Sequence, residues 1–431
     1  MKTHVPFLVL VLLLTTSLTA ALKIQPVSAS GTLYIRADGS IDPPTAPIQR
    51  NGDVYTFTDN IYDSIMVERS NAIVDGNGYI LEGSGSLSYM GLNISNTHNI
   101  TVKNVTIKSF GCGIYLNSTS DNTIFDVVLG GSMTERNHEG ICLEYSNNNS
   151  IFGNSLSKND RGISLGDSLN NSIIANNIVS ATEGISLAYS SNNSITANSI
   201  TDNGNGVLLY SFSDNNSISG NSIARNTYGI YSHTYSSNNS IIGNNITDSR
   251  YGIWLEYSSN NSISGNNITT NNIYDSGYGI RSSYSFNNSI GENNIMANNH
   301  GIYFEYFSNS SIGGNNVADN AFGAELYQSS GNRFYHNNFV NNDVYSYNSE
   351  NVWDNGYPSG GNYWSDYNGT DANNDGIGDT PYIIDANNTD SYSLIVPFAI
   401  PEFPLFFILP LFMTATSLAV IVYRRKNEAM A

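Results

Sequence analysis

The chain has 431 residues, and its 36 acidic side chains outnumber its 17 basic ones, so its formal net charge is −19 at pH 7. This charge repels nucleic acid and anionic lipid, which argues against a nucleic-acid-binding protein and suits contact with cations or neutral glycans. Only two cysteines occur, too few for a disulfide-dense scaffold.

Residues 1–29 have the layout of a secretory signal peptide. A lysine at position 2 precedes an apolar run at residues 5–14, and small residues end the segment at Ala29. We therefore expect an exported protein whose mature chain begins near Ser30. Residues 30–90 hold less regular strand-like segments, and we expect them to form an N-terminal cap and the first coils.

Residues 91–345 contain a repeat led by a glycine and an apolar residue, from Gly113 to Gly323. Each repeat, such as residues 184–202, holds three short alternating segments separated by Asn and Ser, which is typical of strands with polar corners. The pattern predicts an all-β fold, a right-handed parallel β-helix of about ten to twelve coils with about 22 residues each. A leucine-rich-repeat horseshoe needs an L-x-x-L-x-L frame that these repeats lack.

Asparagines recur at one position of the repeat and predict ladders of side-chain amides between stacked coils. They are Asn149, Asn171, Asn193, Asn216, Asn239, Asn261 and Asn288. No proline occurs between Pro47 and Pro358, as a continuous backbone ladder requires.

The two cysteines, Cys112 and Cys142, lie in adjacent repeats but three positions out of phase. On flat strands this offset separates their Cα atoms by roughly 10 Å, beyond the reach of a disulfide. We therefore expect two free thiols.

The strand after each repeat glycine has apolar residues one and three positions later, so the second and fourth positions are expected to face outward. Over five neighbouring coils these outward positions hold aromatic rings, acids and an arginine. Aromatic rings can stack face-on against sugar rings, and carboxylates can accept hydrogen bonds from sugar hydroxyls, which predicts a glycan-binding face. The predicted ligand contacts are Tyr210, Tyr231, His233, Trp254 and Tyr303.

Glu256, Arg281 and Glu305 lie on the same face and predict an alternative, a polysaccharide lyase or glycoside hydrolase. The two acids are two coils apart, which is about 9.6 Å at about 4.8 Å per coil. This distance is near the upper end of the range of about 6.5–9.5 Å between the two carboxyl groups of inverting glycosidases. The plainer interpretation is a surface salt-bridge ladder worth about 0–1 kcal/mol per pair. The Arg-Asn-His-Glu sequence at residues 136–139 adds a uronate epimerase as a further alternative.

Residues 346–398 differ in composition and are expected to form a C-terminal capping module with an Asp-rich loop. Asp371, Asn373, Asp375 and Asp379 place oxygen ligands at alternate positions around glycines, which predicts a calcium site. An EF-hand would need glutamate at its twelfth position, where Tyr382 stands. The alternative is an Asx-turn cap without an ion.

Three features resemble the NosD family of archaeal and bacterial surface β-helices, named after a nitrous-oxide reductase maturation protein and also grouped with carbohydrate-binding and sugar-hydrolase β-helices. They are the N-S-I and G-I repeat units, the Asp-Gly-Asn-Gly sequence at residues 75–78, and the module GNYWSDYNGTDANNDGIGDTPYII at residues 361–384. The resemblance covers most of residues 65–398. It implies an exported right-handed β-helix, with roles from copper-site maturation to glycan contact.

Copper delivery calls for a cluster of His, Met or Cys ligands. The histidines of the outer part fall at different phases of the repeat, so they are not expected to stack into one site. They are His98, His138, His233, His300 and His336.

We expect residues 399–404 to form a linker or sorting motif, residues 405–423 a transmembrane helix, and residues 424–431 a basic cytoplasmic tail. At about 1.5 Å per residue the apolar segment can span a bilayer core of about 30 Å. The tail also resembles the PEF-type sorting signal of archaeal surface proteins, which an archaeosortase processes. Either interpretation leaves the β-helix outside the cell, anchored at its C-terminus.

The leading hypothesis is a membrane-anchored β-helix of the cell envelope that contacts glycans, or serves in adhesion or structure, without turnover. A polysaccharide-active enzyme is second, and a NosD-like copper maturation factor is third. Many N-x-S/T triplets also occur, although the repeat turn itself demands their residues, so each is weak evidence for a glycoprotein. Those that recur with the repeat begin at Asn148, Asn170, Asn192, Asn215, Asn238, Asn260 and Asn287.

Overall fold

The computed structural model describes residues 31–132, 135–271 and 277–400. The predicted signal peptide, transmembrane helix and cytoplasmic tail lie outside these residues. Within the described ranges, no helix is long and apolar enough to cross a membrane.

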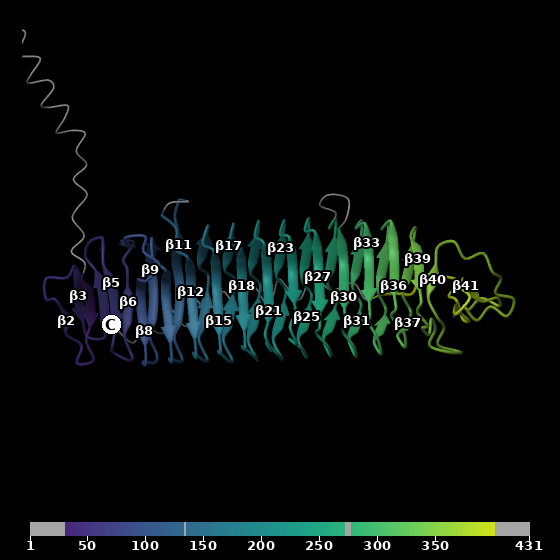
Figure 1. Cartoon of the computed structure of the whole chain (residues 1–431), viewed down its shortest axis with the longest axis horizontal. Helices are drawn as coiled ribbons and strands as arrows, with labels where there is room; N and C mark the ends of the chain where they lie inside the picture. Colours follow the sequence, from purple (N-terminus) through teal and green to yellow (C-terminus); the bar gives the residue numbers. More distant parts are fainter. Residues whose placement is uncertain (1–30, 133–134, 272–276, 401–431) are drawn as a thin grey trace, which may run out of the picture. The chain divides into compact units, whose positions relative to one another are not determined.

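The described chain is a right-handed parallel β-helix of about 14 coils with about 22 residues per turn. Figure 1 shows the coils side by side along the long axis, from the purple N-terminal end to the yellow C-terminal end. One coil consists of a long strand and two short ones, for example β18 (Glu183–Ala188), β19 (Ser194–Thr196) and β20 (Ser199–Thr201). The predicted fold and the three strands per coil are confirmed.

The long strands form one 15-stranded sheet, which we call the long sheet. Beside β18 it contains β2 (Ile41–Asp42), β1 (Thr32–Ile35), β5 (Ser64–Val67), β8 (Met90–Ser95), β10 (Cys112–Asn117), β12 (Glu139–Glu144), β15 (Arg161–Gly166), β21 (Asn205–Tyr210), β24 (Tyr228–Ser232), β27 (Tyr251–Glu256), β30 (Tyr278–Ser283), β33 (His300–Glu305), β36 (Phe322–Tyr327) and β39 (Asp343–Tyr347). The coils exceed the expected ten to twelve because β1, β5 and β8, which precede the first repeat glycine, already pair in this sheet.

The short strands complete the coils on the other sides. They are β3 (Ile48–Asn51), β4 (Val54–Phe57), β6 (Ile73–Asp75), β7 (Ile80–Glu82), β9 (Thr101–Lys108), β11 (Thr123–Gly130), β13 (Ser150–Phe152), β14 (Ser155–Ser157), β16 (Ser172–Ile174), β17 (Asn177–Val179), β22 (Ser217–Ser219), β23 (Ser222–Ala224), β25 (Ser240–Ile242), β26 (Asn245–Thr247), β28 (Ser262–Ser264), β29 (Asn267–Thr269), β31 (Ser289–Gly291), β32 (Asn294–Met296), β34 (Ser311–Gly313), β35 (Asn316–Ala318), β37 (Arg333–Tyr335), β38 (Asn338–Val340) and β40 (Tyr363–Trp364). A hairpin of β41 (Tyr382–Asp385) and β42 (Asn388–Asp390) follows.

The core is a column of aliphatic side chains, since each strand of a coil points its alternate residues inward. In one coil Ile185, Leu187, Ile195 and Ile200 are all fully buried. Each such side chain contributes about 1.5–3 kcal/mol relative to exposure.

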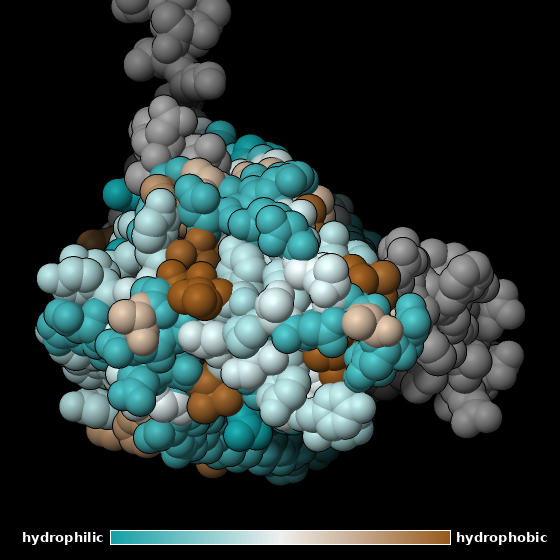
Figure 2. Space-filling view, turned by 90° about the vertical axis from the view of Figure 1, so that its right-hand side faces the viewer, coloured by the Kyte–Doolittle hydropathy of each residue, from teal (hydrophilic) through white to brown (hydrophobic). Residues whose placement is uncertain are grey.

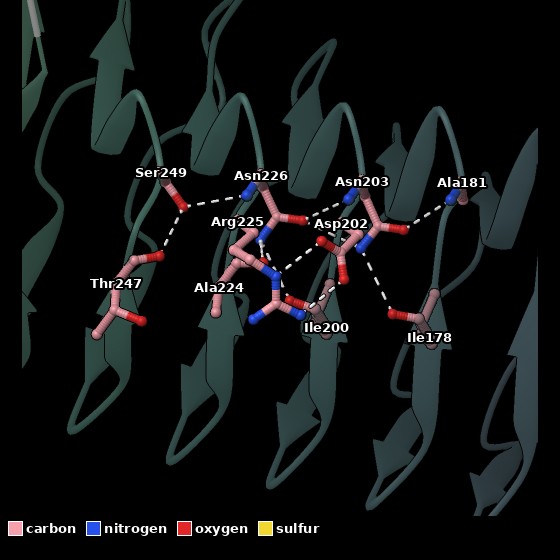
Figure 3. A network of polar contacts seen from close by, with 10 residues as sticks. All are labelled: Ile178, Ala181, Ile200, Asp202, Asn203, Ala224, Arg225, Asn226, Thr247 and Ser249. Carbon is pink, nitrogen blue, oxygen red and sulfur yellow. Dashed lines mark hydrogen bonds and ion pairs between the residues drawn. The ribbon is translucent and has the colours of Figure 1, made fainter. Parts of the chain in front are cut away.

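The predicted amide ladder is present and buried, since the backbone N and the Nδ2 of Asn171 both donate to Oδ1 of Asn193, at 2.8 and 3.1 Å. A second buried ladder runs through other asparagines of the coils. The backbone N and the Nδ2 of Asn198 both donate to Oδ1 of Asn221, at 2.9 and 3.0 Å, and Nδ2 also donates to the Ile173 carbonyl. A further ladder joins Asn203 to Asn226 (Figure 3), with Ser249 in the place of an asparagine. Because these amides have hydrogen-bond partners in the neighbouring coils, the bonds offset the cost of removing the amides from water.

Aromatic rings close the C-terminal end of the core. Trp353 and Trp364 are buried and stack on Phe334 and Phe339, with ring centroids 4.3 and 4.7 Å apart. Viewed from this end, the surface is mostly hydrophilic with small separate hydrophobic patches (Figure 2). The cap therefore shields strand edges and core from water.

The expectation of two free thiols is wrong, because Cys112 and Cys142 form a disulfide with Cα atoms 6.5 Å apart. The expectation assumed flat strands with strict alternation. The long strand departs from alternation at its glycine, where Gly113 and its neighbour Ile114 are both buried. Cys112, the residue before Gly113, therefore turns outward. There it meets Cys142, which lies two residues after Gly140, the repeat glycine of the next coil.

We predict that Asn221→Ala lowers the free energy of unfolding by about 3 kcal/mol, because the N–H groups of Asn198 lose their acceptor and each unsatisfied buried group costs about 1–3 kcal/mol. Urea unfolding measures the change. The matched control is Ser222→Ala, on an exposed neighbour, with an effect below about 0.5 kcal/mol. Equal effects of the two variants would contradict the ladder's role.

We also predict that the double variant Cys112→Ser/Cys142→Ser unfolds at lower urea concentration. Closing a loop between cysteines 30 residues apart contributes about 3–4 kcal/mol in the chain-entropy model. A reductant should lower the urea midpoint of the wild type to that of the double variant and leave the midpoint of the double variant unchanged. A wild type that is insensitive to the reductant in unfolding experiments would speak against this stabilisation.

Candidate functional site

The outward face of the long sheet carries three columns of side chains over β21 to β36. The columns hold the residue before the repeat glycine, the second residue after it and the fourth residue after it. We call this surface the aromatic face. The pre-glycine column is Asn205, Tyr228, Tyr251, Tyr278, His300 and Phe322. The second column, two residues after the glycine, is Leu208, Tyr231, Trp254, Arg281, Tyr303 and Glu325. The fourth column, four residues after the glycine, is Tyr210, His233, Glu256, Ser283, Glu305 and Tyr327.

The structure brings the predicted contact residues together. Trp254 lies between Tyr231 and Arg281 in the strand register, and Arg281 lies opposite Tyr303 on its other side. The ring of Tyr210 stacks on that of His233 at 5.9 Å. All of them occupy the aromatic face, as their phase in the repeat predicts.

The pre-glycine column was missed, because strict alternation would place it inside. Its rings form one stack from Tyr228 to Phe322, with neighbouring centroids 5.0, 5.2, 4.4 and 5.1 Å apart. The glycine explains the turn of the strand: a Cβ on Gly252 would lie 2.5 Å from the carbonyl oxygen of Gly279. The recurrence of a ring immediately before successive repeat glycines was the signal that could have revealed this column.

A recurring contact links the pre-glycine residue of one coil to the second residue of the next coil. The disulfide between the two cysteines is one such contact. In a second, Ser164 donates to the Glu139 carboxylate at 2.6 Å. In a third, His300 Nδ1 lies against the Glu325 carboxylate. His300 lies between two rings of the pre-glycine stack. The aromatic face thus holds a histidine oriented by a carboxylate, which the sequence did not indicate.

Tyr231 connects the second and fourth columns. Its hydroxyl donates to the Glu256 carboxylate, and its ring lies 4.6 Å from His233 and 4.9 Å from Trp254. Burial, and then the hydrogen bond to Glu256, raise the pKa of Tyr231 well above its ordinary value. Burial lowers the pKa of His233, against the opposing effect of Glu256, which favours the neutral imidazole.

Arg281 forms the centre of the face. Its guanidinium carbon lies 4.5 Å from the Trp254 ring and 5.3 Å from the Tyr303 ring, and the group is 3.8 Å from the Glu305 carboxylate. Glu256 instead accepts from Tyr231. Only half of the expected Glu–Arg–Glu ladder therefore forms, and cation–π contacts of about 0.5–2 kcal/mol each hold the arginine.

The two candidate acids are two strands apart, as predicted. Glu256 and Glu305 lie on either side of Ser283 in the register, and Ser283 is buried between them. Their participation in catalysis stays a prediction.

The flat surfaces of the rings are already occupied by protein neighbours. Trp254 is stacked against Tyr231, and the Arg281 guanidinium lies over it. A ligand therefore meets ring edges, hydroxyls, carboxylates and an imidazole. This differs from the face-on stacking that the sequence led us to expect.

A charged cluster continues the same sheet toward the N-terminus. Arg161 pairs with Glu139 and Glu183, each at 3.1 Å. Arg136 and His138 both contact Asp160, at 2.9 and 2.6 Å. Within the Arg-Asn-His-Glu sequence that suggested an epimerase, Arg136 and His138 therefore contact Asp160, whereas Glu139 pairs with Arg161.

The Asp-rich loop uses its oxygens to cap its own turns. Asp371 accepts from the backbone N–H groups of Asp375 and Gly376, and Asp379 accepts from that of Ala372. The hydrogen bond from the Ile377 N–H lowers the pKa of Asp375. In the described ranges no group of three or more His, Cys, Asp or Glu side chains is placed to share a metal ion. Calcium binding by these residues and Asn373 stays a prediction.

Comparisons with solved structures return distant similarities. The A-module of the Azotobacter vinelandii mannuronan C-5 epimerase is 15% identical over 68% of this chain and 88% of that one, with a TM-score of 0.43. The periplasmic alginate epimerase AlgG is 16% identical over 74% of this chain and 84% of that one, with a TM-score of 0.42. The Dettilon tailspike protein is 16% identical over 59% and 60%, with a TM-score of 0.38.

No curated protein sequence matches the chain. A family model described as periplasmic copper-binding protein (NosD) matches residues 70–250 and 234–369. Because these two ranges together cover most of the sequence, the chain belongs to the NosD family.

Proposed function

We propose that this protein is an exported β-helix of the cell surface that binds an extracellular glycan along its aromatic face without chemical turnover. The periplasmic description of the family supports export. The disulfide between Cys112 and Cys142 agrees with it, since disulfides persist mainly in oxidising compartments outside the cytosol. The predicted C-terminal anchor, in its plain form or processed by an archaeosortase, would keep the protein at the envelope.

The observation that carries the proposal is a continuous row of half-buried polar groups across neighbouring coils. It offers the hydroxyl of Tyr231, the imidazole of His233, the guanidinium of Arg281 and the carboxylates of Glu256 and Glu305. Sugar hydroxyls can donate to the carboxylates and to the oxygen of Tyr231, can accept from the guanidinium, and can do either with a neutral imidazole. A glycan chain lying along the solenoid would meet an equivalent position in each coil, at intervals of about 4.8 Å.

The charges of the face favour a neutral or cationic glycan. The acids Glu256, Glu305 and Glu325 outnumber the single arginine, and the net charge of the whole chain is −19. A polyuronate chain would meet like charge along this row.

A polysaccharide-active enzyme is the second candidate, favoured by one observation. The register sets Glu256 and Glu305 two strands apart on one surface with Arg281 between them. Two carboxyl groups at such a spacing leave room for a water molecule beside a sugar ring. In this alternative the pair would act as general acid and general base.

Copper maturation is the third candidate, because the matched family model is described as copper-binding. Its residues are not indicated by the structure: Cys112 and Cys142 are oxidised, and the histidines of the described ranges lie at separate positions. This candidate therefore depends on the family description alone.

We predict that the full-length protein in detergent is retained by immobilised neutral envelope polysaccharides. Tyr231→Phe and Glu256→Gln should each weaken retention about tenfold, roughly 1.4 kcal/mol. Tyr335→Phe, which removes a half-buried tyrosine hydroxyl on β37, is the matched control. No new reducing or unsaturated ends should appear.

The other outcomes of this assay identify the alternatives. New chain ends that disappear in Glu256→Gln would establish the enzyme. Absence of retention together with tight Cu(I) binding in a titration would establish the copper candidate.

We further propose that the Asp-rich loop binds calcium, and we predict that EDTA lowers the melting temperature of the wild type. A ligand that binds only the native state stabilises it by about 2.7 kcal/mol at a hundred times its Kd. Asp375→Asn should abolish the EDTA effect, and Asp126→Asn, at an exposed position elsewhere, should keep it. An unchanged melting temperature of the wild type would leave the loop as an Asx-turn cap.

A further inference from the structure

Two exposed columns run along the turn that follows the long strand, separate from the aromatic face. The first column consists of aromatic rings that are 42–60% exposed: Tyr145, Tyr189, Phe212, Tyr235, Tyr257, Tyr284 and Tyr306. Three residues after each ring stands an exposed asparagine that begins an N-x-S triplet: Asn148, Asn192, Asn215, Asn238, Asn260, Asn287 and Asn309. The turn thus repeats the pattern of a ring, two residues and a glycosylation triplet in seven coils.

The backbone conformation of this turn accounts for the presence of asparagine in the second column but not for the aromatic residues of the first. Both columns have left-handed φ values, for example 50° at Tyr257 and 57° at Asn260. Asparagine is enriched in this region, whereas a bulky aromatic residue is disfavoured there. Stacking between neighbouring rings, such as Tyr257 on Tyr284 at 4.9 Å, offsets the strain in part. The exposed ring edges still lack a covering group.

Where a triplet of this turn reads Asn-Asn-Ser, its two asparagines have different environments. Asn261 is buried, and its backbone N and Nδ2 both donate to Asn288. Asn260 is exposed, and in the part of the chain that the structure describes its carboxamide has no hydrogen-bond partner. The same holds for Asn148, Asn192, Asn215, Asn238 and Asn287. The free carboxamide is the group to which an N-linked oligosaccharide is attached.

We propose that this edge of the solenoid carries N-linked glycans, and that the exposed ring three residues earlier packs against the first sugar. The donor class is an oligosaccharide linked to a lipid pyrophosphate. Nδ2 of the asparagine forms a bond to the sugar C1, the bond from C1 to the pyrophosphate oxygen breaks, and one amide proton is released. The apolar sugar face then covers the ring edge. The proposal requires export but does not depend on a ligand of the aromatic face.

The spacing of the coils limits the number of glycans. Neighbouring acceptor asparagines are one coil apart, about 4.8 Å, and an oligosaccharide is wider than that. We therefore expect modified asparagines on non-adjacent coils. Asn170 occupies the same column with the same φ of 57°, but Asp167 replaces the ring before it. Its occupancy should be lower than that of ring-preceded members.

The test is glycopeptide mass spectrometry of the full chain purified from the envelope of the cells that produce it. We expect glycans on at least two ring-preceded asparagines of the column, and less at Asn170 and Asn245, which have no ring before them. Complete absence of glycans from the column would overturn the proposal. Equal occupancy at Asn170 and at the ring-preceded members would overturn the role of the ring.

Variants at one modified coil separate the acceptor from the ring. For Asn260, Ser262→Ala should abolish modification because it destroys the triplet, while Ser264→Ala, two residues further along β28, should leave it intact. Tyr257→Asp, which places there the residue type found at the equivalent Asp167 and creates no new triplet, should lower occupancy at Asn260 at least twofold. Unchanged occupancy in Tyr257→Asp would contradict packing of the ring on the sugar.

Discussion

The close contact between the glycines of successive coils is the constraint on which the aromatic face depends. At Gly252 a side chain would collide with the Gly279 carbonyl oxygen at 2.5 Å and with an inner isoleucine at 2.7 Å. The long strand therefore runs close to the core at this point, and the residue before each glycine turns outward. From this follow the pre-glycine ring stack, the disulfide and the contact between His300 and Glu325.

The second constraint is the pairing of buried amides between coils. Asn216, for example, accepts from Asn193 in the coil before it and donates to Asn239 in the coil after it, so the ladder holds only while the register is kept. This explains how the protein tolerates a core corner made of polar residues. It also explains why the adjoining asparagine, which faces water, is free for another role.

Two surfaces with different chemistry result from one repeat. The aromatic face combines half-buried rings with acids and Arg281, and its ring surfaces are taken up by internal stacking. The turn edge instead exposes ring edges beside free carboxamides. Membership of the NosD family accounts for the solenoid. The glycan ligand that we propose for one surface and the glycan modification that we propose for the other depend instead on the side chains of this chain.

Periodicity in the sequence was enough to predict the parallel β-helix, the inward isoleucines, the amide ladders and the outward positions of Tyr231, Trp254 and Arg281, because these depend on local alternation and on a constant repeat length. It was not enough to predict the pairing of Cys112 with Cys142 or the pre-glycine rings. These depend on how far the strand bends at its glycine, which is decided by contact with the neighbouring coil. Only the tertiary structure therefore determined which side chains meet across coils and which ring surfaces remain open.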